Sequence, residues 1–225
     1  MVPVIAYFGP PGTFTEMALD AVLAEQQSAD GLDLSGGVDR VAASSPAATI
    51  AMIRTGDADY GCVPIESSLE GSVPATMDAL VPPMADGADG RVQAFAETVL
   101  DISFAIAAAT PMSAADVRTI AAYPVASAQV RQSIGELFPN AEFVIASSNA
   151  AAAQDVAAGK ADAAVTTGLA ARLSGLVVLA DGVADAREAT TRFLLVGRPG
   201  VPLPRTGADR TSVILELSNE PGSLM

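Results

Sequence analysis

The sequence contains no histidine, no tryptophan and only one cysteine, and aromatic residues make up 4% of its 225 residues. Without histidine, the chain cannot use Ser-His-Asp or Cys-His catalysis, and it cannot form an ordinary zinc site. The single cysteine, Cys62, excludes a disulfide within the chain and fits a reducing compartment. Because Cys62 lies in an apolar run, we expect an inert buried thiol there and not a reactive one.

Basic residues are also scarce. The chain has 12 Lys and Arg against 26 Asp and Glu, which gives a formal net charge of -14. Nucleic acids and anionic membranes are recognised by basic patches, so this charge argues against both as partners, and we expect neither. A small anionic substrate is not excluded, because one or two arginines and the N-terminus of a helix can hold it.

Long apolar segments are absent as well. No uninterrupted apolar run approaches the roughly 20 residues that a transmembrane helix needs. Met1 is followed by Val-Pro-Val, without the basic residues or the cleavage site of a signal peptide, so we expect a cytoplasmic protein. Half of the residues are hydrophobic and alanine is abundant, which predicts a folded α/β protein with strands covered by Ala-rich helices.

The N-terminal pattern predicts a strand, a loop and a helix. Residues 4–8 are an apolar strand, and the Gly/Pro loop 9–15 follows it. Thr13 and Glu16 have the spacing of a capping box, which predicts a helix from there to about Gln27. Such a loop directs backbone N–H groups and a positive helix end at an anion. The alternative is a tight βα turn without a ligand.

A second polar cluster follows the predicted strand 60–65. Glu66, Ser67 and Ser68 come directly after it, at the start of the next predicted helix. In open α/β sheets, sites lie at the carboxyl ends of strands, so this cluster is a candidate site. A solvated helix cap would explain the two serines equally well.

The second half of the chain repeats part of the first half at an offset of 159 − 56 = 103 residues. Both halves contain a serine-capped helix, then a glycine, an aspartate and a short strand. The glycine and aspartate are Gly56 and Asp59 in the first half and Gly159 and Asp162 in the second. Polar residues follow the strand both times, and Thr166 and Thr167 are the second set. The repeat predicts two similar α/β lobes with a central cleft between them.

The remaining boundaries follow from this repeat. The first lobe is expected to comprise residues 1–97 and 178–200, and the second lobe residues 98–177. Residues 92–109 are apolar and β-prone, and we expect two strands or one strand that crosses between the lobes. Residues 127–138 are predicted to form one amphipathic helix. Three prolines between 199 and 204 mark a linker, placed at residues 201–210, and residues 211–217 form a further predicted strand.

Near the end of the second half, Thr190, Thr191 and Arg192 precede the apolar run 193–196, which predicts a buried strand. Such a strand can place a proton donor beside a cation at one rim. The alternative is that the threonines cap a loop and that Arg192 pairs with a local carboxylate.

Three stretches, in this order, carry a resemblance to a known family. They are Gly9-x-x-Gly12-Thr13-Phe14-Thr15, Pro64-Ile65-Glu66-Ser67-Ser68-x-Glu70-Gly71-x-Val73 and Thr191-Arg192-Phe193. Together they resemble prephenate dehydratase, a lyase of phenylalanine biosynthesis, and the second stretch is the most specific. The resemblance covers essentially the whole chain. It implies a two-lobe α/β catalytic region similar to type II periplasmic-binding-protein folds, with the site between the lobes.

The implied reaction converts the dianion prephenate to phenylpyruvate with loss of water and carbon dioxide. The enzyme must supply a proton for the leaving hydroxyl and a fixed pose, and general-acid help of this kind is worth roughly 10²–10⁴-fold in rate. No metal or organic cofactor is implied. By similarity Thr191 delivers the proton, and Glu66 is the second catalytic residue. The implied substrate-binding residues are Thr13, Phe14, Ser67, Ser68, Gln129, Thr190, Arg192 and Phe193.

Two departures from the family pattern concern this site. Ser67 stands where the family usually has Asn, so that one substrate contact is expected to pass through water. The family's Ser-His-Pro stretch before its glutamine is Ala122-Tyr123-Pro124 here. Two rivals remain open at this point: a non-catalytic, bilobal solute-binding protein, and an enzyme subunit that has lost activity.

Residues 211–225 resemble the truncated start of an α+β ACT regulatory domain, with Pro221-Gly222-Ser223-Leu224 in place of the usual Pro-Gly-Ala-Leu. This implies that phenylalanine acts as an effector only in a full-length chain. We also expect a homo-oligomer.

Overall fold

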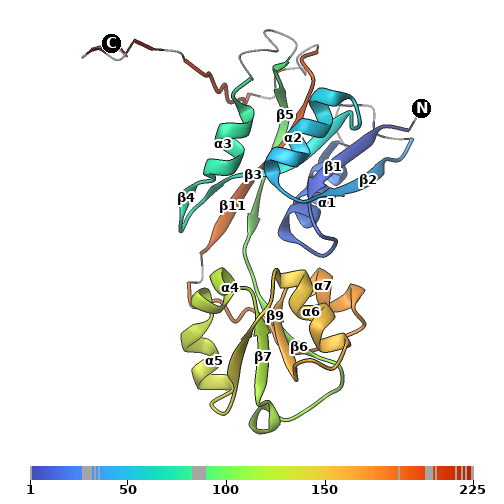
Figure 1. The fold of residues 1–225 in the computed structure, drawn as a ribbon, viewed down its shortest axis with the longest axis vertical. Coiled ribbons are helices and arrows are strands. Elements are labelled where there is room, and N and C mark those ends of the chain that lie inside the picture. The colour runs from blue at the N-terminus through green and yellow to red at the C-terminus, as the bar shows by residue number, and fades with distance from the viewer. Residues whose placement is uncertain are drawn as a thin grey trace.

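The structure is a computed structural model, and it describes residues 2–26, 32, 34, 36–82, 90–186, 188–200, 205, 207–215, 217–218, 220 and 222–223. Two lobes, each built on one mixed sheet, lie one above the other and are joined by two crossing segments (Figure 1). Half of the predicted linker 201–210, namely residues 201–204 and 206, lies outside the described residues, as do Pro221 and Leu224 of the predicted ACT motif.

The first lobe has a six-stranded sheet in the order β2-β1-β3-β11-β5, with β4 paired to β3. Its strands are β1 (Val4–Phe8), β2 (Asp39–Ala43), β3 (Tyr60–Ser67), β4 (Gly71–Ser72), β5 (Gln93–Asp101) and β11 (Thr190–Gly197). Its helices are α1 (Phe14–Gln26), α2 (Pro46–Thr55) and α3 (Pro74–Leu80). Strand β11, which lies between β3 and β5, follows the whole second lobe in the sequence, so the first lobe is discontinuous in sequence.

The second lobe has a five-stranded sheet in the order β10-β6-β9-β7-β8. Its strands are β6 (Ala105–Ala108), β7 (Thr119–Ala122), β8 (Glu142–Ile145), β9 (Ala163–Thr166) and β10 (Val177–Ala180). Its α-helices are α4 (Pro124–Gln129), α5 (Arg131–Leu137), α6 (Asn149–Ala157) and α7 (Gly168–Leu173). The two strand orders have similar centres. In the first sheet β3 lies between parallel β1 and antiparallel β11, and in the second β9 lies between parallel β7 and antiparallel β6.

The repeat predicted from the sequence corresponds to equivalent local structures in the two lobes. Ser45 caps α2 by accepting a hydrogen bond from the Ala48 N–H, and Ser148 caps α6 by accepting one from the Ala151 N–H. Asp59 accepts from the N–H of Val4 at the start of β1, and Asp162 accepts from the N–H of Thr119 at the start of β7. The prediction of two similar α/β lobes is therefore confirmed.

Two segments connect the lobes. Residues 102–104 join β5 to β6, and residues 181–189 join β10 to β11. The segments are hydrogen-bonded to each other, from the Ile102 N–H to the Ala189 carbonyl at 2.7 Å and from the Val183 N–H to the Phe104 carbonyl at 3.1 Å. The lobe boundaries predicted at 97/98 and 177/178 fall inside β5 and β10. Because all of β5 belongs to the first sheet and all of β10 to the second, each boundary lies a few residues later in the structure. Residues 92–109 were expected to form either two strands or one strand that crosses between the lobes. They form two strands, β5 and β6.

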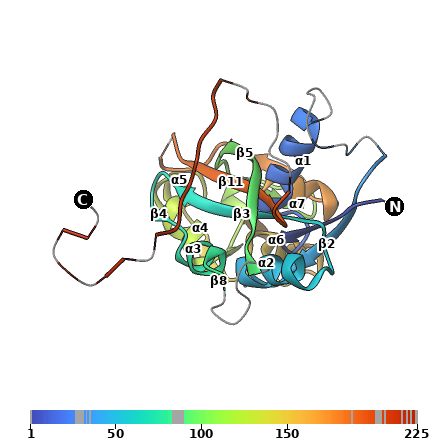
Figure 2. The ribbon, with the colours of Figure 1, turned by 90° about the horizontal axis from the view of Figure 1, so that it is seen from above.

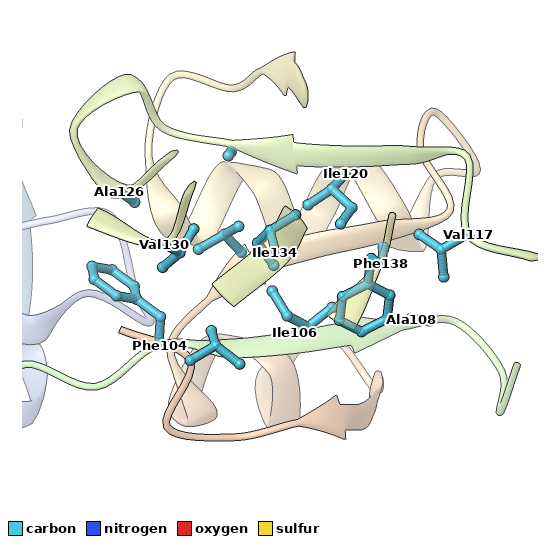
Figure 3. Close-up of a cluster of buried hydrophobic side chains, with 13 residues drawn as sticks. Phe104, Ile106, Ala108, Val117, Ile120, Ala126, Val130, Ile134 and Phe138 are labelled. Carbon is cyan, nitrogen blue, oxygen red and sulfur yellow. The ribbon is translucent and has the colours of Figure 1, made fainter. Parts of the chain in front are cut away.

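The second lobe has its own apolar core. Figure 3 shows Val130, Ile134 and Phe138 beside Ile106 and Ile120, on the face of the sheet that α4 and α5 cover. The first lobe has a separate core under α1 and a smaller one under α2. Phe14 packs against the cores of both lobes, and its ring meets that of Phe104 edge-on at a centroid distance of 5.6 Å.

Two predicted elements differ in the structure. The single helix expected over residues 127–138 is two helices, α4 and α5, which meet at Val130. The side chain of Val130 is fully buried in the core, and its backbone leaves the helical region there. The strand expected over residues 211–217 is also wrong for its described part, because residues 211–215 and 217 form no strand and Val213 is 71% exposed.

Among the described residues, no helix is both long and apolar enough to cross a membrane.

Candidate active site

The antiparallel pairing of β3 with β11 brings together two of the predicted site stretches. Ser67 lies opposite Thr191, and Glu66 lies opposite Arg192, although these residues are more than 120 positions apart in the chain. The register shifts once, between Arg192 and Phe193, where β3 carries one extra residue. The two polar stretches therefore share one end of the central strand pair. In Figure 1 this end of the first lobe faces α4 of the second lobe.

The two serines after β3 are held in place by local hydrogen bonds. The Ser68 N–H donates to the Thr190 carbonyl, and the Thr190 N–H donates to Ser68 Oγ, both at 2.9 Å. Ser67 Oγ accepts from the N–H groups of Leu69 and Glu70 at 3.3 and 3.4 Å. Ser68 thus extends the pairing of β3 with β11 by one residue, and Ser67 stabilises the turn into β4.

Arg192 forms ion pairs with carboxylates of its own lobe. Its Nη2 lies 2.7 Å from Glu66 Oε2, and its Nη1 lies 3.2 Å from Glu97 Oε2. Burial lowers the pKa of Arg192, but the hydrogen bonds to Glu66 and Glu97 outweigh it and raise the pKa above its usual value. Its Nε is buried and has no hydrogen-bond partner among the described residues. Arg192 thus pairs with carboxylates, as in the alternative interpretation, but with carboxylates that are 126 and 95 positions away in the sequence and not local ones. Its charge is already compensated.

Thr191 and Arg192 point to opposite faces of the sheet, because successive residues of a strand alternate. Thr191 shares a face with Phe193 and Leu195, which belong to the core under α1. Arg192 shares a face with Leu194 and Val196, which belong to the core under α2. A proton donor at Thr191 would therefore lie across the sheet from the Arg192 guanidinium and not on the same face. Phe193 is only 2% exposed, so its ring packs in the core and is not available to a ligand.

The loop after β1 is attached to the second lobe. Thr167 donates a hydrogen bond from Oγ1 to the Gly12 carbonyl at 2.7 Å and accepts one from the Ala170 N–H at 3.0 Å. Gly12 has a φ of 90°, and a Cβ at this position would lie 2.8 Å from the Cβ of Ala170. Only glycine fits this backbone and this contact. Thr167, expected to line a cleft, is fully buried between the lobes instead.

Thr13 and Phe14 lie at the start of α1, but the predicted capping box forms only in part. The Glu16 carboxylate accepts from the Gly12 N–H at 2.6 Å, one residue before the expected Thr13. Thr13 Oγ1 donates to the Phe8 carbonyl at 3.3 Å. Phe14 is half-buried between the two cores, so its main contact in the structure is the packing of one lobe against the other.

Gln129 lies in the second lobe at the C-terminal end of α4 and is half-buried. Its backbone carbonyl accepts a hydrogen bond from the N–H of Asp185 at 2.8 Å. Asp185 also binds the first turn of α5 through its carboxylate. No motif or spacing in the sequence singles out Asp185 from the other acidic residues.

A cavity of about 450 Å³ lies against α6 and α7. It is lined by Pro11, Ala150, Gln154, Ala157, Ala158, Ala170, Leu173 and Ser174. None of the predicted site residues lines it, so cavity volume does not locate the site. Within the described part of the chain, no group of three or more Cys, Asp or Glu residues is arranged to hold a metal ion.

Comparison with known proteins identifies the family. A sequence model of the family described as prephenate dehydratase matches residues 5–200. A prephenate dehydratase of Mycolicibacterium vanbaalenii is 55% identical over 227 residues, which cover 100% of this chain and 71% of that protein. The chain belongs to the prephenate dehydratase family.

Solved structures agree with this assignment. A prephenate dehydratase of Arthrobacter aurescens in complex with L-Phe matches with a TM-score of 0.81 and 34% identity, covering 98% of this chain and 68% of that one. A protein named GqqA, described as a novel type of quorum-quenching acylase, matches with a TM-score of 0.70 and 29% identity, covering 90% and 66%. Because proteins with these two different descriptions share the fold, the fold alone does not identify the family. The assignment rests on the family match and on the higher identity to prephenate dehydratases. The two-lobe α/β fold expected from the resemblance is the one observed.

Proposed function

We propose that this chain catalyses the decarboxylating dehydration of prephenate to phenylpyruvate, as a prephenate dehydratase of phenylalanine biosynthesis. The observation that supports the proposal is the β3–β11 pairing, in which Thr191 is the register partner of Ser67 at the end of the sheet that faces the second lobe. Membership in the family supports the substrate. A lone, buried thiol at Cys62 supports a reducing compartment such as the cytoplasm.

Thr191 is the proposed proton donor. The leaving hydroxyl of prephenate takes a proton and departs as water, while the ring carboxylate departs as carbon dioxide. The electron pair of the broken carbon–carbon bond completes the aromatic ring, so the reaction needs no electron acceptor. The proton lost by Thr191 returns from solvent. The chain has no histidine to replace this group, which makes the hydroxyl the available donor at this position.

The other predicted residues have different proposed roles. Ser67, Ser68 and Thr190 form the rim next to Thr191, and Gln129 contributes an amide from the second lobe. Thr13 and the first turn of α1 offer N–H groups to a substrate carboxylate, because the N-terminus of a 13-residue helix carries partial positive charge.

Arg192 reaches a substrate carboxylate only by exchanging it for Glu66 or Glu97. We therefore propose that the Arg192–Glu66 pair chiefly fixes the end of β3, and that Glu66 acts through this pair.

A turnover assay with substitutions at Thr191 tests the proposal. The wild-type chain should convert prephenate to phenylpyruvate at neutral pH. Thr191→Ala should lower kcat by roughly 10²-fold with little change in affinity, and Thr191→Ser should retain much of the activity. Thr55→Ala is a matched control, because Thr55 is an exposed threonine at the end of α2. Near-normal turnover of Thr191→Ala would show that another group donates the proton.

The same assay separates the rivals. A solute-binding protein would bind prephenate and release it unchanged, and a subunit without activity would give no phenylpyruvate although it folds. For the expected homo-oligomer, support comes from the edge strand β8, where Phe143, Val144 and Ile145 are all exposed and Ile145 is 81% exposed. Light scattering of the purified chain measures its mass directly, and a monomer at all concentrations would contradict this expectation.

A further inference from the structure

The first turn of α5 obtains its hydrogen-bond acceptors from a distant segment. The first N–H groups of a helix have no partner within the helix and need an external acceptor. The residue at the N-cap of α5 is Val130, whose side chain cannot accept a hydrogen bond. The acceptor where α4 and α5 meet must therefore be water or a group from elsewhere in the chain.

Asp185 supplies this acceptor. Its Oδ2 accepts from the Gln132 N–H at 3.0 Å, and its Oδ1 accepts from the Ser133 N–H at 2.9 Å and from Ser133 Oγ at 2.8 Å. Its own N–H donates to the Gln129 carbonyl at 2.8 Å. Burial raises the pKa of Asp185, but the hydrogen bonds from Ser133 and Gln132 outweigh it, and the pKa lies below its usual value. The carboxylate is thus ionised and bound in the folded protein.

The segment that contains Asp185 also leads directly to Thr191. Four residues after Asp185, the Ala189 carbonyl accepts from the Ile102 N–H, and the backbone of Thr190 is bound at both ends by Ser68. One end of this short connection is therefore fixed to the helix end that carries Gln129, and the other end is fixed to the strand that carries Thr191.

We propose that Asp185 is a positioning residue that fixes Gln129 of the second lobe relative to Thr191 of the first. The inference rests on the proposed function, in which these two residues meet the same substrate. Asp185 itself does not touch the substrate and acts through the position of Gln129. Displacing a substrate-positioning group by about 1 Å can cost up to 10²-fold in rate, so the interaction is expected to affect catalysis as well as folding.

The same segment provides a matched control. Asp181 lies four residues earlier, is exposed, and its Oδ1 accepts from the N–H of the adjacent Gly182 at 2.8 Å. Asp181→Ala and Asp185→Ala both remove one negative charge from the same connection. The two variants therefore change the field at the substrate in the same direction, and only Asp185→Ala releases the junction between α4 and α5.

The experiment is a double-mutant cycle on prephenate turnover with Asp185→Ala, Gln129→Ala and both together. We expect Asp185→Ala to lower kcat/KM about tenfold or more, mainly through KM, and Asp181→Ala to stay within about twofold of the wild type. Because Asp185 acts through Gln129, the double variant should be no worse than Gln129→Ala alone. Fully additive losses, or equal effects of the two aspartate variants, would overturn the proposal.

Hydrogen exchange supplies a readout that does not depend on turnover. In Asp185→Asn, one oxygen still accepts from Ser133, but an amide group faces the Gln132 N–H, so this milder variant should fold even where the alanine variant does not. Loss of protection at Gln132 and Ser133 should be accompanied by faster exchange at Thr190 and Thr191. If only the helix amides lose protection, Asp185 merely caps α5 and the inference is wrong. A wild-type chain that does not turn over prephenate would instead refute the proposed function.

Discussion

Replacing Thr167 with valine removes a single hydroxyl that forms hydrogen bonds on both sides of the contact between the lobes. Thr167 is fully buried, and its Oγ1 both accepts from the Ala170 N–H at 3.0 Å and donates to the Gly12 carbonyl at 2.7 Å. Valine has nearly the same volume, so the change leaves packing almost intact. The lost free energy therefore measures the two hydrogen bonds.

The expected destabilisation follows from these two bonds. Loss of an N-cap hydroxyl, here at the start of α7, costs typically about 1 kcal/mol. The Gly12 carbonyl would remain buried without its partner, and an unpaired buried acceptor costs about 1–3 kcal/mol. The sum is about 2–4 kcal/mol, which for a chain of this size corresponds to a fall in melting temperature of roughly 4–16 °C.

Differential scanning calorimetry of Thr167→Val and Thr167→Ser separates the hydroxyl from the methyl group. The serine variant retains both hydrogen bonds and loses one methyl group, so it should lose only about 1 kcal/mol. Equal melting temperatures of the two variants would refute the reasoning. A valine variant as stable as the wild type would mean that water or a shift of the loop satisfies the Gly12 carbonyl.

The remaining predictions concern charge, reactivity and regulation. Arg192→Leu removes the cation next to Glu66 and one of the two cations next to Glu97, which also pairs with Arg210 at 3.3 Å. It should lower the melting temperature more than Arg192→Lys, which retains the charge but cannot bind both carboxylates in a planar fork; equal melting temperatures would contradict this. Burial raises the pKa of Cys62 to about 12, so a thiol reagent at pH 8 should label it only after unfolding, and rapid labelling of the native chain would show that it is accessible. Phenylalanine should leave turnover of the 225-residue chain unchanged, because the described residues between 211 and 217 form no strand of an effector-binding sheet; inhibition would place an effector site in the two lobes.

The two-lobe architecture could be predicted because its signals are local in the sequence. Ser45 and Ser148 cap their helices through the residue three positions later, and Gly56 and Gly159 both have positive φ near the ends of those helices. Spacing alone is sufficient to detect such features. The offset of 103 residues between the halves therefore predicts the equivalent helix-to-strand units of the two lobes without any knowledge of strand pairing.

The partners of the site residues could not be predicted in the same way. Arg192 binds Glu97, which is 95 positions away, and Asp185 binds the start of α5, which is more than 50 positions away. With 26 acidic residues in the chain, nothing local distinguishes these carboxylates from the others. The break at Val130 was missed for the same reason, since the apolar spacing continues through it and the cap comes from Asp185. The opposite orientations of Thr191 and Arg192 followed from strand alternation, and this could have been inferred from the sequence.

The position of β11 in the first sheet has a consequence for the order in which the lobes fold during synthesis. This strand lies between β3 and β5, so those two strands lack their shared neighbour until residues 190–197 have left the ribosome. All five strands of the second sheet lie between Ala105 and Ala180, and each of them is available earlier. Domains generally fold as units as the chain emerges. The second lobe, which follows β5 in the chain, can therefore be complete while the first lobe still lacks the strand that joins β3 to β5.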